Sequence, residues 1–342
     1  METPNTPIHP ESQYPREPKA IRTICGFWRR LFAFFVDSLI LGVFGLILGM
    51  AFFNFFAELG SAGRLFGFTV ALLYFGIQNS SLCDGQTIGK RIFNIKVVDH
   101  DMNSISPQRS FARFTILGFP YFLNGALFPP TLLNNFFLSL FIGLIVFFGL
   151  FGIVYLYIFN RKTRQSLHDL IVGTYVVNAT AVTRFSFQPL WKGHLAVLSV
   201  LFLSILIVMT IVVPKLGQKN FFKELLAVQQ RIQETGLVHA TNVSAGKSYG
   251  TSTGTGEATE WETTFFKVTA VLKQKPSKID MTINEIANVV LATYPPIMEK
   301  DALVINVSYG YDIGIARAWR TQRRQNSPKE WQRLLFQDTE NI

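Results

Sequence analysis

Five long stretches almost free of charged residues limit most strongly how this chain can fold. Residues 31–56 carry Asp37 as their only charged side chain, and residues 136–159 carry none. At about 1.5 Å of rise per helical residue, the first stretch extends about 39 Å, enough to cross a bilayer with some tilt. The other three stretches are residues 65–82, 114–128 and 195–213. They exclude a single water-soluble globule and predict an integral membrane protein.

The composition agrees with this interpretation. Only 16% of the residues are charged, compared with about 25% in a typical soluble domain. The hydrophobic content of 49% also excludes a disordered chain.

Few residues offer redox, metal or catalytic chemistry. Cys25 and Cys83 both precede the C-terminal region, and we expect no structural disulfide between them. The five histidines are scattered without metal-ligand spacing, and the C-terminal region contains no Ser/His/Asp or Cys/His grouping. We therefore expect no metal site, no cofactor and no enzymatic activity.

The apolar stretches divide the chain into four parts. Residues 1–22 are polar and rich in proline, and are expected to be a flexible tail. Residues 23–179 would form a transmembrane module with spans at about 31–56, 65–82, 114–128 and 136–159. Residues 180–214 would supply a linker and a fifth span at about 195–213, before a domain at 215–342. The sequence predicts an α-helical transmembrane bundle of about five spans followed by a small α+β soluble domain.

The basic residues predict an orientation. Five Lys or Arg residues stand before the first span, five between the second and third, and five after the fourth, whereas the remaining connections hold Arg64 alone. The positive-inside rule places these three basic segments in the cytoplasm and the C-terminal domain outside the cell membrane. If the segment 114–128, broken by Pro120, is re-entrant instead, the third basic segment and the C-terminal domain change sides.

One acidic residue lies at membrane depth. Arg30 and Asp37 are seven residues apart and share nearly one helix face, with Asp37 two turns deeper. A carboxylate there costs about 2.5–3.5 kcal/mol on insertion scales, so it should face protein or water. Asp37 is then either a proton or ion site, or a hydrogen-bonding group that fixes helix packing.

Two loops on the same predicted side of the membrane each contain a short turn followed by a stretch that favours a β-strand. Gly85 and Gly89 suit a tight turn, and the neighbouring Lys90 and Arg91 could meet lipid phosphates. The apolar stretches 92–99 and 174–178 favour strands, and we expect them to pair as a small cytoplasmic sheet.

Three ordered blocks in this region resemble those of the RDD family of membrane proteins. They are residues 26–37 (GFWRRLFAFFVD), 85–91 (GQTIGKR) and 164–177 (RQSLHDLIVGTYVV), and the resemblance covers about residues 22–180. The family is named for an arginine at the start of the first span, an aspartate within it and a later aspartate. These match Arg30, Asp37 and Asp169. The resemblance implies a multi-pass helical module for which transport of ions or small solutes has been suggested; the C-terminal span and domain lie outside it.

The matched residues suggest a contact between loop and helix. Arg30 and Asp169 would both lie at the cytoplasmic face, where a guanidinium and a carboxylate can form two parallel hydrogen bonds. The alternative is that Arg30, Asp37 and Asp169 only lock the bundle together. His168 could titrate near neutral pH, or serve simply as a hydrogen-bonding side chain.

The C-terminal domain shows its own pattern of elements. We expect a helix at 218–235, strands at 237–243 and 260–273, a helix from the Thr282–Glu285 capping box, strands at 302–309 and 311–319, and a last helix from Ser327. Residues 244–259 would be a flexible loop or the tip of a hairpin, and the sheet antiparallel. The four late arginines, Arg317, Arg320, Arg323 and Arg324, favour a solvated or lipid-facing rim over a nucleic-acid site.

Two classes of function remain open. In the first, the bundle moves a cation, proton or small solute, with Asp37 and Asp169 as coupling groups. In the second, the bundle is an anchor or scaffold whose outer domain binds a protein partner. The expected partners are membrane lipids, a second copy of the chain, or an extracytoplasmic protein, and not nucleic acid.

Overall fold

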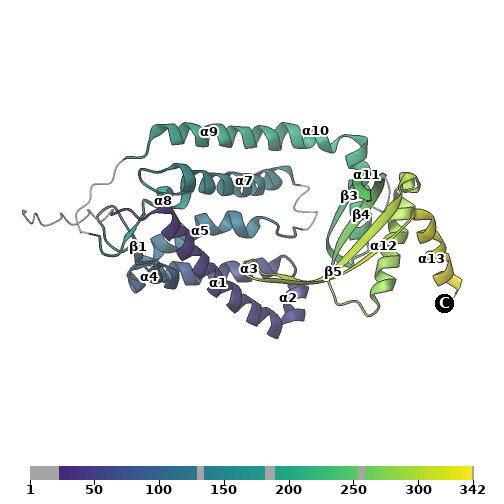
Figure 1. Ribbon diagram of the computed structural model, residues 1–342, viewed down its shortest axis with the longest axis horizontal. Coiled ribbons are helices and arrows are strands. Elements are labelled where there is room, and N and C mark those ends of the chain that lie inside the picture. The colour runs from purple at the N-terminus through teal and green to yellow at the C-terminus, as the bar shows by residue number, and fades with distance from the viewer. Residues whose placement is uncertain (1–22, 129–134, 182–188, 253–258, 341–342) are drawn as a thin grey trace, which may run out of the picture.

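The computed structural model describes residues 23–128, 135–181, 189–252 and 259–340. It contains a helical bundle and a C-terminal α+β domain placed at one end of that bundle (Figure 1). The predicted tail at 1–22, residues 182–188 of the linker before the last span, and residues 253–258 of the predicted loop lie outside the described residues.

The bundle is built from apolar helices that run between its two ends. These are α1 (Phe27–Ala51), α2 (Phe53–Leu59), α3 (Ala62–Gln78), α5 (Pro107–Leu123), α7 (Phe136–Phe159) and α9 (Lys192–Ile207), and α9 continues through η2 (Val208–Val212) into α10 (Val213–Gly217). In Figure 1, α9 and α10 lie along the outer edge, with α7 and α5 beneath them.

The predicted number of five spans is not confirmed. In the described parts of the chain, three helices are long and apolar enough to cross a membrane: Phe27–Ala51, Phe136–Phe159 and Lys192–Gly217. The pair α2 and α3, bent by 110°, adds a fourth if it is counted as one span. Both α3 and α5 have only 17 residues, or about 26 Å of helix. In addition, α5 begins at Pro107 rather than near 114, because Ser106 caps its first turn.

One end of the bundle carries a small sheet, and we call it the β1/β2 end. It contains η1 (Ser81–Cys83), α4 (Ile88–Ile92), β1 (Ile95–Val98), α8 (Leu167–Val172) and β2 (Tyr175–Asn178). The expected pairing is confirmed: β1 and β2 are antiparallel, with Ile95 opposite Asn178 and Val98 opposite Tyr175. Burial of Ile95, Val97 and Val176 in one apolar cluster with Cys25 holds this sheet against the start of α1.

The C-terminal domain has the expected order of elements. It comprises α11 (Asn220–Glu234), β3 (Val238–Ser252), β4 (Thr259–Leu272), α12 (Ile279–Thr293), η3 (Pro295–Glu299), β5 (Ala302–Asp312), β6 (Arg317–Asn326) and α13 (Pro328–Glu340). The sheet order is β3-β4-β5-β6, and its core includes Val228 from α11, Phe266 from β4, Ile286 from α12 and Trp331 from α13.

The prediction of a purely antiparallel sheet is wrong. The β3/β4 and β5/β6 pairs are antiparallel, but β4 and β5 are parallel. The reason is that α12 returns the chain to the end of the sheet where β4 began, which makes a parallel crossover.

Several predicted boundaries in this domain are also wrong. Residues 244–252 continue β3 instead of forming a loop, because β4 pairs with them as far as Ser252. Helix α12 begins at Ile279 without a side-chain cap, so Thr282 is not its N-cap. The chain turns at residues 313–316 and not at Gly310, which pairs with Trp319 inside the β5/β6 ladder. Ser327 does cap the last helix, accepting a hydrogen bond from the Glu330 N–H at 3.3 Å.

The turn between β5 and β6 (residues 313–316), here called the β5–β6 turn, enters the bundle. Ile313 is fully buried, and Tyr121 on α5 donates a hydrogen bond to the Gly314 carbonyl at 3.0 Å. Helix glycines make room for it, since a Cβ at Gly67 would overlap the Ile313 carbonyl. Beside the turn, Arg64 Nη2 lies 2.6 Å from Asp312 Oδ2. The domain is therefore packed into the helices as well as tethered to them.

Candidate functional site

The Asp37 carboxylate is fully buried at the β1/β2 end and is held by neutral donors. Oδ1 accepts hydrogen bonds from the Tyr74 hydroxyl at 2.7 Å and the Gly89 N–H at 2.8 Å, and Oδ2 accepts one from the Thr87 hydroxyl at 2.6 Å. Thr87 also caps α4 by accepting from the Lys90 N–H. The Asp37 group thus joins α1, α3 and α4. Although Arg30 and Asp37 share a helix face, their side chains do not pair.

The two predicted loop glycines have different roles. Gly85 has a φ of +69° and stands in a tight turn against Val97, as expected. Gly89 is helical, and a Cβ there would overlap the Ala33 carbonyl of α1. Its role is therefore to let α4 approach α1 closely, so that its own N–H reaches Asp37.

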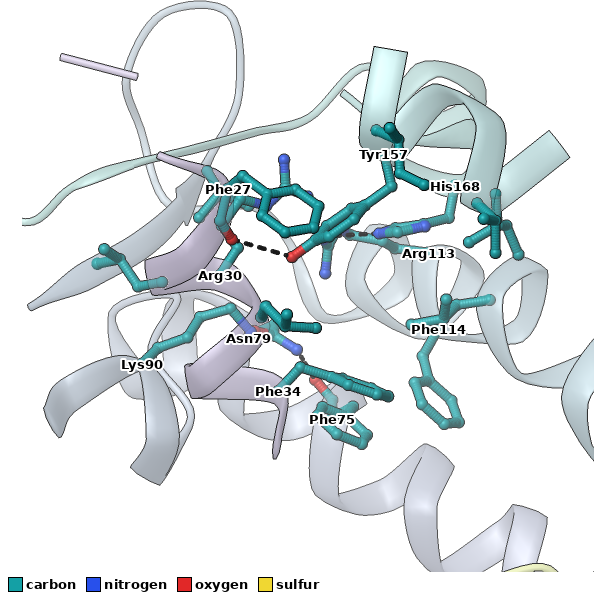
Figure 2. Close-up of a pocket in the computed structure, with 17 residues that line it drawn as sticks. Phe27, Arg30, Phe34, Phe75, Asn79, Lys90, Arg113, Phe114, Tyr157 and His168 are labelled. Atoms are coloured by element: carbon teal, nitrogen blue, oxygen red, sulfur yellow. Dashed lines mark hydrogen bonds between the residues drawn. The ribbon is translucent and has the colours of Figure 1, made fainter. Parts of the chain in front are cut away.

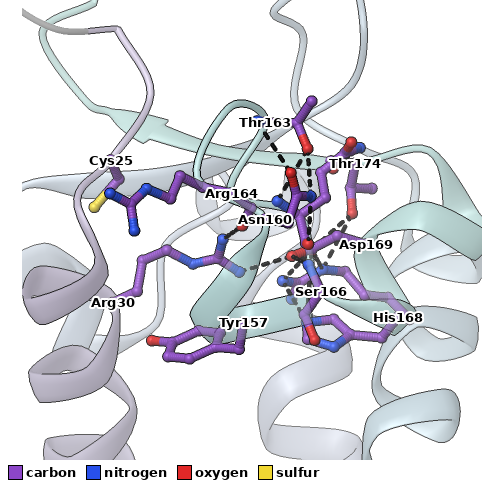
Figure 3. Close-up of polar contacts among 12 residues, drawn as sticks. Cys25, Arg30, Tyr157, Asn160, Thr163, Arg164, Ser166, His168, Asp169 and Thr174 are labelled. Carbon is purple, nitrogen blue, oxygen red and sulfur yellow. Dashed lines mark hydrogen bonds and ion pairs between the residues drawn. The ribbon is translucent and has the colours of Figure 1, made fainter. Parts of the chain in front are cut away.

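The Asp169 carboxylate is the centre of a second polar group. The residue is positioned by a capping box with Ser166 at the start of α8 (Figure 3). Its Oδ2 accepts from Arg30 Nη2 at 2.7 Å. Its Oδ1 accepts from Arg113 Nη2 at 2.6 Å and Arg113 Nε at 2.9 Å. All three charged side chains are buried.

The predicted two-bond pair between Arg30 and Asp169 is corrected in one respect. The two residues do form an ion pair, but Arg30 gives it only one nitrogen, because its Nη1 donates to the Arg164 carbonyl. Arg113 supplies the double contact instead. The loop after α7 is therefore tied to both α1 and α5.

Arg113 is the site residue that sequence reasoning missed. It was counted among the loop cations, whereas it lies inside α5. The signal that could have placed it is Ser106 followed by Pro107, the usual start of a helix. Tyr74 and Thr87, the donors to Asp37, carry no comparable sequence signal.

The environment sets the charge of the buried groups. Burial would raise the pKa of Asp169, but the Arg113 and Arg30 guanidinium groups outweigh it and hold that pKa well below its usual range. Burial lowers the pKa of Lys90 to about 7, and repulsion from Arg113 adds to the effect. Burial also lowers the pKa of His168 to about 3. His168 is therefore neutral at pH 7, which favours the alternative of a simple hydrogen-bonding side chain over a group that titrates near neutral pH.

The geometry also fixes the tautomer of His168. Its Nε2 lies 3.1 Å from Arg113 Nη2, and a guanidinium can only donate. Nε2 must therefore be the acceptor, which leaves the proton of the neutral ring on Nδ1. Nδ1 is buried and has no hydrogen-bond partner among the described residues.

A cavity of about 290 Å³ lies beside these groups (Figure 2). Its polar lining includes Arg30, Asn79, Lys90, Arg113 and His168. Lys90 points inward and donates to Asn79 Oδ1 at 2.7 Å, so it does not face lipid phosphates as expected. Arg91 is exposed and lies apart from the cavity. The two neighbouring cations of the sequence motif therefore have separate environments.

A second cavity of about 250 Å³ adjoins the first. It reaches Gly314 and Ile315 of the β5–β6 turn. Six lining residues are shared by the two cavities: Phe34, Phe75, Phe114, Leu117, Ile153 and Val154. Together the cavities extend from the Asp169 group to the C-terminal domain.

The described part of the chain brings no three His, Cys, Asp or Glu side chains together as a possible metal-ion site. The residues available to a ligand are instead the cations and aromatic rings of the first cavity.

Comparison with known proteins gives a match over the bundle. A sequence model described as the RDD family matches residues 24–173. The chain is similar to an uncharacterized protein, YckC, from Bacillus subtilis (strain 168), with 31% identity over 155 residues, which are 45% of this chain and 85% of that protein. No solved structure matches the chain.

Proposed function

The chain belongs to the RDD family, and we propose that its helical bundle moves an ion or small solute across the membrane. The family and the apolar helices make it a membrane protein. The transported species would pass through the interior of the bundle, between the β1/β2 end and the C-terminal domain.

The observation that supports this proposal is the pair of adjoining cavities. They share six side chains and lie among α1, α3, α5 and α7. One borders Arg30 and Arg113, and the other ends at the β5–β6 turn. The two cavities together offer a continuous space beside Arg30 and Arg113 in which a solute could be held.

The buried charges supply the coupling groups of the proposal. Asp37 is a carboxylate surrounded by neutral donors, and ionisable groups at membrane depth commonly mark transport pathways. Asp169 is held ionised by two arginines. A solute that entered the first cavity beside Arg30 and Arg113 would change the charge balance around Asp169. We place the β1/β2 end in the cytoplasm, by the positive-inside rule.

The test is a flux measurement on the purified chain in proteoliposomes. Wild type is compared with Asp37→Asn over a panel of monovalent cations, protons and small anions. The expected result is flux of one species that Asp37→Asn lowers at least tenfold. Asp84→Asn is the matched control, since Asp84 is exposed and its φ of 55° suits Asn. Equal flux in wild type, Asp37→Asn and empty vesicles for every species would refute the proposal.

The second candidate is an anchor whose C-terminal domain binds a protein partner. The domain has an extensive apolar core, to which α2 of the bundle adds Ala57 and Phe53, and the size of this core favours this candidate. The buried β5–β6 turn argues against a domain that works apart from the helices. Flux through the full chain distinguishes the two, because an anchor gives none in proteoliposomes, whereas a transporter does.

A further inference from the structure

The first cavity is lined by charges of one sign. Its charged lining residues are Arg30, Lys90 and Arg113. The two nearby carboxylates, Asp37 and Asp169, do not line it, because their oxygens are turned to their own donors. The charged groups that line this cavity are therefore cations, of which Lys90, whose pKa is about 7, is protonated in only part of the molecules at pH 7.

The cations are not balanced by these carboxylates. Arg30 and Arg113 share the single negative charge of Asp169. Lys90 contacts the neutral amide of Asn79. Bringing like charges together in a buried site is unfavourable, so an added anion would relieve the repulsion.

A buried donor without a partner lies in the same lining. The deduced Nδ1–H of His168 meets no acceptor in the described structure, and His168 itself lines the cavity and is 5% exposed. An unmet buried donor costs about 1–3 kcal/mol. Nδ1 itself has almost no accessible surface, so an anionic oxygen in the cavity would satisfy it only after the ring rotates.

The remaining wall is apolar and opens sideways. Phe75, Phe114 and Leu117 continue from the cations toward the second cavity. On the flank between α1 and α7, the lining residues Phe34 and Val154 are 47% and 53% exposed. In a bilayer this flank faces the acyl chains, so a ligand can enter from the membrane without passing through water.

We propose that the cavity binds an anionic amphiphile from the bilayer, with a phosphate or carboxylate head among Arg30, Lys90, Arg113 and His168, and an acyl chain along Phe75 and Phe114. The inference names the class of solute for the proposed function and in that sense rests on it. The binding itself can be measured without any flux.

The experiment is a binding titration of the full chain in a nonionic detergent. The probes are dioctanoyl phosphatidate, dioctanoyl phosphatidylcholine and inorganic phosphate. Isothermal titration calorimetry measures the binding of each. We expect phosphatidate to bind at least tenfold more tightly than either of the other two. Equal binding of phosphatidate and phosphatidylcholine would overturn the anionic head, and equal binding of inorganic phosphate would overturn the amphiphile.

Two variants locate the site. Lys90→Gln removes one lining charge and leaves the Asp169 group intact, and we expect it to weaken phosphatidate binding about tenfold. Leu117→Trp fills the apolar part and should also weaken it. Arg91→Gln, a neighbouring exposed cation, is the control and should bind as wild type does. If both cavity variants melt like wild type and bind phosphatidate unchanged, the inference is wrong.

The same measurements separate the two proposals. Selective phosphatidate binding in a protein that shows no flux would leave the site standing and remove the transport function. Cation flux by a protein that binds no phosphatidate would support the transport function and refute the amphiphile site.

Discussion

Arg113 holds the Asp169 carboxylate with two nitrogens, its Nε at 2.9 Å and its Nη2 at 2.6 Å, both on Oδ1. The two residues come from α5 and α8 and are both buried. Arg30, the arginine of the family motif, gives the same carboxylate a single nitrogen. Arg113 therefore makes the larger contribution to holding Asp169.

Arg113→Lys should destabilise the protein more than Arg30→Lys. A lysine cannot reproduce the double contact, and each lost charge-assisted bond is worth about 1.5–3 kcal/mol. Thermal unfolding of the purified variants in detergent measures the difference. Equal melting temperatures would show that the double contact adds nothing.

Gly89→Ala should loosen the packing of α4 on α1. Its Cβ would overlap the Ala33 carbonyl, and such overpacking costs about 1–3 kcal/mol. The same substitution at Gly217 has open space around it and should leave the melting temperature unchanged. Should Gly89→Ala melt like Gly217→Ala, the close approach of the helices is not required.

Asp37→Asn should fold with a modest loss of stability, about 1–2 kcal/mol. The oxygen of the new amide can still accept the hydrogen bonds from Tyr74 and Gly89. The amide nitrogen can donate to the Thr87 hydroxyl, but that hydroxyl then loses the carboxylate oxygen to which it donates in wild type. Size-exclusion profiles and melting curves check this. An aggregated Asp37→Asn would mean that the charge itself is needed for folding.

Stability should fall with acid because of His168. Its pKa is 6.5 in the unfolded chain and about 3 in the fold, so between these values the unfolded state binds the extra proton. Unfolding free energy should then drop by up to about 1.4 kcal/mol per pH unit as the pH falls through this window. The charged groups facing His168 are Arg30, Lys90, Arg113 and Asp169. Melting of His168→Gln at pH 7.5 and 5.0 should depend less on pH than that of wild type; an identical dependence would contradict the assignment.

Gly67→Ala should displace the β5–β6 turn. The new Cβ would overlap the backbone carbonyl of Ile313, which cannot rotate away. Maleimide labelling of Ile315→Cys, with Cys25 and Cys83 replaced, should become faster when Gly67→Ala is added. Thr69→Ala, on an exposed position of the same helix, is the control and should leave the labelling rate unchanged.

The sequence predicted the parts of the fold that depend on local patterns. Apolar length located α1, α7 and the last long helix, and alternation located β1 and β2 together with their pairing. The parallel neighbours β4 and β5 could not be predicted in this way, because the direction of pairing depends on where α12 returns the chain. The full length of β3 could not be predicted, because residues 244–252 have little strand propensity of their own and are extended only because they pair with β4.

The candidate site was predicted in part. Arg30, Asp37 and Asp169 are all buried, as expected for charged side chains that contact protein and not lipid. Arg113 and Asn79 join the cavity through tertiary packing, which no spacing in the sequence expresses. Lys90 and Arg91 are adjacent in the sequence, yet Lys90 lines the cavity and Arg91 is exposed on the outside. The sequence alone does not distinguish these two environments.

The burial of the β5–β6 turn has a consequence for how the protein is made. Ribosomes synthesise α1 and α3 long before residues 313–316, so Gly45 of α1 and Gly67 of α3 lack their contacts with this turn while more than two hundred further residues are added. The contacts that α1 and α3 make with the β5–β6 turn can therefore form only after residues 313–316 have been synthesised.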